Sequence, residues 1–151
     1  MIKLIVFGVI VVLSSVAIML IYMCKMASDR SGWSRLAKRH GLRGNFDGKR
    51  LRLQTGSLNY FAFHRVLNLG AGPSGLYLCP AFHLRPFHPP VVIPWGDLKG
   101  HRFADSHHAG LALEVGGVDD IELRFSEETV DRLRPLVDPS WTGAAVLLDT
   151  A

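Results

Sequence analysis

The chain begins with one long uncharged stretch and then changes to short alternating runs. From Leu4 to Cys24 no residue is charged, and Lys3 and Lys25 bracket a stretch rich in Leu, Ile, Val and Met. A helix rises about 1.5 Å per residue, so this stretch is roughly 30 Å long as a helix, which matches the hydrocarbon core of a bilayer. The pattern predicts one membrane-spanning helix within residues 1–25.

A cleavable signal peptide is the alternative for the same stretch. Its apolar core is normally about 7 to 15 residues long and is followed by a small-residue cleavage site. This stretch is longer and ends in Ile21-Tyr22-Met23-Cys24. Met23 also argues against a lipoprotein site at Cys24, because a small residue is needed there. We therefore expect an uncleaved anchor.

Residues 26–44 are expected to be a basic segment that contains one short helix. Trp33, Leu36 and His40 fall on one face at helical spacing, and Gly41 can end the helix. Trp33 could anchor this helix in the bilayer interface, or it could cover the core of the following domain. The narrow apolar stripe and the shortness of the helix favour the second interpretation.

From Arg50 onward apolar residues recur at every second position, which is typical of strands. Strands are expected over residues 51–55, 59–69, 76–79, 91–93, 111–115 and 121–125, and the last two form a hairpin around a turn at 116–119. Ser126, followed by two Glu, predicts a final helix that Pro135 and Pro139 close. Because no helical pattern separates the strands, the sheet should be antiparallel, with the helices at its ends. We expect a β domain at 45–138 and a C-terminal tail at 139–151.

The element order and two short patterns resemble the pleckstrin-homology-like (PH-like) fold, and most closely its GRAM-like bacterial relatives, small proteins of unknown function that often carry a membrane anchor. The patterns are Gly75-Leu-Tyr-Leu78 and Ile93-Pro-Trp-Gly-Asp-Leu98. The likeness covers roughly residues 45–137. It implies a mainly β protein, in which a single N-terminal transmembrane helix precedes a PH-like antiparallel β-barrel or sandwich with a C-terminal helix. It also implies binding of lipid or protein and no catalysis.

The charges are distributed unevenly along the chain. Lys and Arg total 17 against 13 acidic residues, which gives a net charge of +4. Only Lys3 precedes the apolar stretch, whereas nine basic residues follow it up to Arg52. Since Lys and Arg resist translocation, we expect the N-terminus outside and the domain in the cytoplasm, at the cell membrane, which is the inner membrane in a bacterium. The two cysteines imply no disulfide framework in that compartment.

The basic residues nearest the anchor are the candidate contacts with anionic lipid headgroups. They are Arg30, Arg35, Lys38, Arg39, Arg43, Lys49 and Arg50. Near an anionic leaflet each such residue contributes on the order of 1 kcal/mol. The same charges could instead serve only to set topology, and a partner membrane protein is the other expected ligand. Nucleic acid is not expected as a partner, because the chain is tethered and lacks a strand face that combines aromatic and basic residues.

Two further features are candidates for chemistry. Gly70-Ala-Gly72-Pro-Ser-Gly75 has the spacing of a dinucleotide fingerprint, but a strand pattern follows it where the fingerprint needs a helix, so we expect a turn and no cofactor. The stretch 83–98 is rich in Pro and His; its prolines exclude a helix, and we expect an extended connection leading into a strand at 91–93. The alternative function is a small metal-dependent hydrolase that uses some of the histidines His83, His88, His101 and His107. The histidines come from separate loops and strands, so we assign no catalytic or metal-binding residue and do not expect an enzyme.

Overall fold

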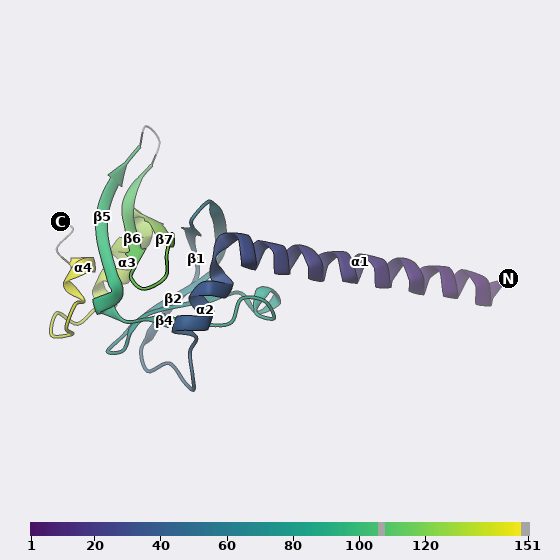
Figure 1. Ribbon diagram of the computed structural model, residues 1–151, viewed down its shortest axis with the longest axis horizontal. Helices are drawn as coiled ribbons and strands as arrows, with labels where there is room; N and C mark the ends of the chain where they lie inside the picture. Colours follow the sequence, from purple (N-terminus) through teal and green to yellow (C-terminus); the bar gives the residue numbers. More distant parts are fainter. Residues whose placement is uncertain (106–107, 149–151) are drawn as a thin grey trace.

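A computed structural model of the chain describes residues 1–105 and 108–148. Helix α1 (Ile2–Ser31) projects from a compact β domain as a single unbroken rod (Figure 1). It is long and apolar enough to cross a membrane. Gly32, at φ 86°, ends α1 and leads directly into α2 (Trp33–His40). α1 therefore continues six residues past Lys25, and no loop separates the expected anchor from the basic segment.

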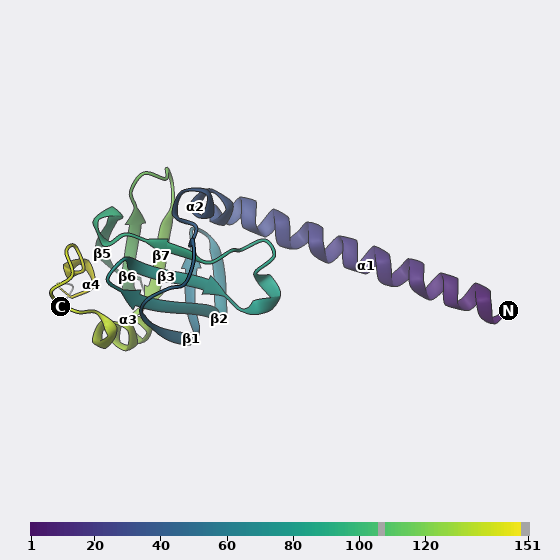
Figure 2. The ribbon, with the colours of Figure 1, turned by 90° about the horizontal axis from the view of Figure 1, so that it is seen from below.

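The domain is one antiparallel sheet whose seven described strands follow the order β4-β3-β2-β1-β7-β6-β5. The strands are β1 (Lys49–Leu58), β2 (Phe61–Gly72), β3 (Gly75–Pro80), β4 (Val91–Ile93), β5 (Leu98–Ala104), β6 (Ala109–Val115) and β7 (Glu122–Ser126). In Figure 2 the half that contains β2 and β3 crosses over the half that contains β6 and β7, so the sheet curls into a half-barrel. The mainly β architecture with a leading apolar helix is thus confirmed.

Several local predictions from the sequence are confirmed. Leu111, Leu113, Leu123 and Phe125 all point into the core from the β6–β7 hairpin. The glycine-rich segment is a tight turn at residues 73–74 between β2 and β3, with no helix after it. Helix α3 (Glu127–Leu133) starts at the predicted cap, because the Ser126 hydroxyl accepts a hydrogen bond from the backbone N–H three residues on, at 3.4 Å.

The structure differs from the sequence-based expectation in one whole strand, since β5 was not predicted, and in three details. In β1 a bulge puts Leu53 at φ 55° and turns its side chain outward, so that Gln54 is buried in place of Leu53. The first hairpin turns at Asn59–Tyr60, since β1 continues through Leu58. The connection before β4 is not extended throughout, because it contains a 3₁₀ turn, η1 (Phe82–Leu84).

The core lies inside the curl of the sheet and is closed by helices. α2 contributes Trp33 and Leu36, both 0 % exposed, so the apolar face of this helix is covered by its own domain. α3 contributes Val130 and Leu133, and the chain then passes through η3 (Arg134–Leu136). The C-terminal tail packs back through α4 (Ala145–Leu148), with the 3₁₀ turn η2 (Trp95–Asp97) on the same side of the domain.

Candidate functional site

The junction between α1 and the domain is fixed by one asparagine. Asn59 donates from Nδ2 to the carbonyl of Ser31 at 3.1 Å, and its Oδ1 accepts from the backbone N–H of Glu122 at 2.9 Å. Its own N–H donates to the Glu122 carbonyl at 2.8 Å. At φ 52° it occupies the left-handed region, which Asn tolerates better than most residues. A single turn residue thus ties the end of α1 to β7.

A second set of contacts holds α1 and α2 against the loop before β4. The Ser28 hydroxyl donates to the Phe87 carbonyl at 2.6 Å, and the Trp33 indole N–H donates to the Pro89 carbonyl at 2.9 Å. The Trp33 ring also packs against Phe63, with ring centroids 5.7 Å apart. The domain therefore contacts the end of α1 on two sides, and only Gly32 separates α1 from α2, so we expect a rigid joint here and not a flexible linker.

Beside this joint lies an open depression of about 360 Å³ that combines charged groups from four segments. Its lining defines what we call the α1-side rim: Arg30, Arg35, Asn59, Tyr60, Asp120, Glu122 and Arg124. Arg124 donates from Nε to the Glu122 carboxylate. Arg35 donates to the Asp119 carbonyl at 3.1 Å. The rim therefore presents three guanidinium groups against two carboxylates, one of which is already engaged.

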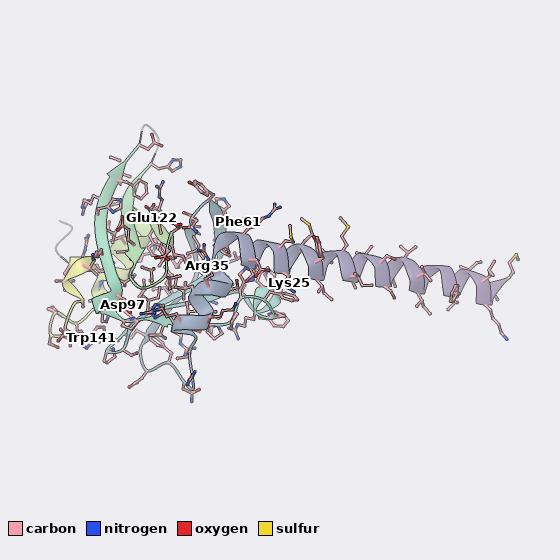
Figure 3. The ribbon with its side chains drawn as sticks, in the orientation of Figure 1. Lys25, Arg35, Phe61, Asp97, Glu122 and Trp141 are labelled. Carbon is pink, nitrogen blue, oxygen red and sulfur yellow. The ribbon has the colours of Figure 1, made fainter. Side chains whose placement is uncertain are left out.

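The seven basic residues predicted from the sequence do not form one patch. Arg30 and Arg35 line the α1-side rim, whereas Arg39 and Arg43 line a different depression with His40. Lys38 is exposed on α2. Figure 3 shows Lys25, Arg35 and Phe61 around the base of α1 and Trp141 at the opposite side of the domain. Whether any of these residues contacts lipid stays a prediction.

Lys49 and Arg50 lie at the other end of β1 from the joint. A ten-residue strand is roughly 30 Å long. There Arg50 stacks over Tyr77 at 4.8 Å and over Phe46 at 5.5 Å, measured to the ring centroids. Burial, together with a hydrogen bond to Cys79, raises the pKa of the Tyr77 hydroxyl to about 12, so this ring stays neutral. Arg50 is thus engaged in packing on the outer face of the sheet.

A larger cavity, about 670 Å³, lies at this far end of β1. Its walls come from the start of β1, the β2–β3 turn and the segment after α3, and they include Asp47, Lys49, Asp138 and Trp141. The cavity is open and brings together only two carboxylates and one ammonium group. It offers no arrangement of titratable groups that indicates a reaction.

The histidines are not assembled into a metal centre within residues 1–105 and 108–148, where no three His, Cys, Asp or Glu side chains converge. His83 and His101 are exposed on different segments, and His107 lies outside the described residues. His88 is 2 % exposed and packs edge-on against Trp33 and Phe63. Burial lowers the pKa of the His88 imidazole below its ordinary value, so His88 is a neutral packing residue and is not free to contact a ligand.

His40 is also buried and lies beside a carboxylate. Its Nε2 is 4.0 Å from the Asp97 carboxylate and has no hydrogen-bond partner among the described residues. Burial lowers the pKa of His40, and the charge of Asp97 offsets part of that effect. The lowered pKa favours the neutral imidazole, so His40 packs the end of α2 beside the turn before β5 without forming an ion pair.

Sequence reasoning missed five members of the α1-side rim, which are Asn59, Tyr60, Asp120, Glu122 and Arg124. Asn59 was placed at the start of a strand, although an Asn between two apolar runs is a recognised signal for a tight turn. Arg124 was expected only as part of the strand at 121–125. Its proximity to Arg30 depends on β7 pairing with β1, which no local pattern shows.

Comparisons with known proteins add nothing to this geometry. No family model, no curated protein and no solved structure matches the chain.

Proposed function

We propose that the chain is a single-pass membrane protein whose PH-like domain is held at the cytoplasmic leaflet and binds anionic lipid headgroups through the α1-side rim, without catalysis. In this proposal the apolar part of α1 crosses the bilayer. The excess of Lys and Arg after it supports the cytoplasmic orientation. The curled antiparallel sheet followed by α3 agrees with the PH-like architecture that the sequence resembles.

The observation that carries the proposal is the rigid joint between α1 and the domain. Arg30 lies six residues after Cys24, which is about 9 Å along a helix. This distance is close to the range over which charges act at physiological salt, about 8 Å. With no flexible linker, the domain cannot move its rim away from the headgroups, so Arg30 and Arg35 remain beside them.

The charges of the rim suit a phosphate group better than a cation. Glu122 is engaged by Arg124, which leaves Asp120 as the one unengaged carboxylate facing Arg30 and Arg35 in the rim. A guanidinium group offers a planar pair of donors that fits phosphate oxygens. Arg30 and Arg35 are therefore the residues expected to meet the lipid phosphate.

Native mass spectrometry of the full chain tests this function. The protein would be released from vesicles of phosphatidylcholine and phosphatidylglycerol in equal parts, at low and at high salt. Both lipids carry a phosphate, but only phosphatidylglycerol carries a net negative charge. We expect the bound lipid to be enriched in phosphatidylglycerol at low salt, with less enrichment at high salt.

Equal binding of the two lipids at both salt concentrations would reject anionic-lipid recognition. Recovery of the chain in complex with a second membrane protein, without lipid enrichment, would favour the partner-protein alternative.

A further inference from the structure

The loop between β3 and β4 presents an aromatic side chain to solvent. Phe82, in η1, is 81 % exposed, whereas its neighbour Leu84 is half-buried. His83 and Arg85 on the same turn are exposed as well. Single exposed apolar residues are common on protein surfaces, so the place of this ring in the fold decides what it can contact.

This loop is also the part of the domain that lies furthest along α1 toward the N-terminus. In both Figure 1 and Figure 2 the teal segment that contains η1 extends beyond the rest of the domain beside the helix. The burial of α1 agrees, since its residues are exposed up to Met23, whereas Cys24 is partly covered and Ser28 is buried. The Ser28 to Phe87 hydrogen bond fixes the loop at this level.

The apolar stretch of α1 ends at the same level. Cys24 is its last residue and Lys25, which is exposed, is the first charged one. A helix that crosses a bilayer has the boundary between acyl chains and headgroups at this point. The loop and the end of the apolar stretch are thus far apart in the sequence but lie side by side in the fold.

Contacts with the domain and several prolines restrict the conformation of the loop. The His88 Nδ1 atom lies 3.1 Å from the Leu84 carbonyl, and the His88 ring is wedged against Trp33 and Phe63. Three prolines, at 86, 89 and 90, restrict the backbone further. A stiff loop loses little conformational entropy when its tip enters another phase.

We infer that the 81–88 loop is a second membrane contact, in which Phe82 inserts at the boundary of headgroups and acyl chains and Arg85 meets lipid phosphate. The inference rests on the proposed membrane-spanning role of α1. An aromatic ring with a cation three residues away is the composition that favours the bilayer interface. With α1 it gives the domain two separate attachments, which fix its rotation about the helix axis.

The β1–β2 turn provides an internal contrast. Tyr60 is fully exposed at 103 %, but in both views its hairpin extends less far along α1 than the η1 segment does. We therefore expect Tyr60 to reach no deeper than the lipid headgroups, and Phe82 to lie deeper in the bilayer than Tyr60.

Photo-crosslinking in the intact protein tests the inference. p-Benzoylphenylalanine would replace Phe82, Tyr60 or His101 in the full chain in vesicles. His101 is exposed on β5, at the side of the domain away from α1, and serves as the control. Because burial of a phenyl group favours an apolar phase by about tenfold or more, we expect roughly tenfold more lipid adduct at 82 than at 101, with 60 between them.

A protein adduct at 82, or equal lipid adduct at 82 and 101, would overturn the membrane-contact role of the loop. Carbonate extraction of the same samples separates this failure from that of the proposed function. If the chain stays in the membrane while 82 gives no lipid adduct, only the loop inference fails. If carbonate releases the chain, the membrane-spanning role fails, and the inference fails with it.

Discussion

Arginines lie beside both ends of β1, but their surroundings differ. At the α1 side Arg30 and Arg35 line an open depression beside a rigid joint. At the far end Arg50 is stacked on Phe46 and Tyr77, about the length of the strand away. All three arginines come from the same basic stretch of sequence. If the rim binds lipid as we propose, distance from the apolar helix and the packing of each side chain should matter more for lipid binding than the local density of charge.

The largest expected effect is on the free energy of unfolding, and it compares the tryptophan at each end, Trp33 and Trp141. Trp33→Ala removes a fully buried ring and its hydrogen bond to Pro89, and should lower the free energy of unfolding by about 3–5 kcal/mol. Trp141→Ala removes a half-buried ring that stacks on Trp95, and should cost about 1–2 kcal/mol. Denaturant unfolding in detergent, followed by circular dichroism, measures both. Equal losses would remove the distinction between the two ends.

The next largest effect is on lipid selectivity, for which two matched pairs of basic residues can be compared. Replacing Arg30 and Arg35 by Gln should reduce the enrichment of phosphatidylglycerol over phosphatidylcholine, by about 2 kcal/mol or roughly 30-fold for two charges near an anionic surface. Replacing Lys49 and Arg52 by Gln, at exposed positions near the far end, makes the same change in net charge and should leave the enrichment nearly unchanged. Similar losses in the two variants would show that net charge alone attracts the lipid.

Asn59→Gly tests the joint itself. Glycine keeps the positive φ of the turn but loses both side-chain hydrogen bonds, so the free energy of unfolding should fall by about 1–2 kcal/mol. Hydrogen exchange should increase at the end of α1 and at the start of β7. A variant as stable and as protected as the wild type would show that Asn59 does not couple these elements.

The smallest effect is acid sensitivity at the α1 side. The lowered pKa of His88 means that the unfolded chain takes up a proton at a higher pH than the folded chain does. The stability that neutral His88 contributes is therefore full above about pH 6.5, the ordinary pKa of a histidine, and is lost as the pH falls below that value. The loss in the free energy of unfolding is no more than about 1.4 kcal/mol per pH unit. Unfolding of His88→Asn should show a weaker dependence on pH than unfolding of the wild type. His83→Asn, at an exposed position on the same loop, is the matched control.

Much of the fold was predictable because local patterns determine it. The long uncharged stretch, the β6–β7 alternation and the Ser126 cap each depend on neighbouring residues, and the structure confirms the helix, the hairpin and the start of α3. The outward turn of Leu53 was not predictable, because a bulge breaks the period of two without leaving a Gly or Pro as a signal. The 3₁₀ turn η1 was missed for a related reason, since prolines exclude a long helix but permit one short turn.

The candidate site was predictable only in part. The sequence identified Arg30 and Arg35 as cations near the anchor, but grouped them with Lys49 and Arg50, which lie at the opposite end of β1 from the joint. Arg124 and Tyr60 join the rim through the pairing of β1 with β7, a long-range contact. Such pairing depends on the packing of the whole domain.

The central claim is that α1 and the domain form one rigid unit. Spin labels on cysteines that replace Lys25 and Lys99, in a Cys24→Ser background, would report the distance between the end of α1 and β5 in vesicles. Cys79, at 1 % exposure, should remain unlabelled. We expect a single narrow distance distribution, which broadens in Trp33→Ala. A broad distribution in the unaltered joint, as a flexible linker gives, would contradict it.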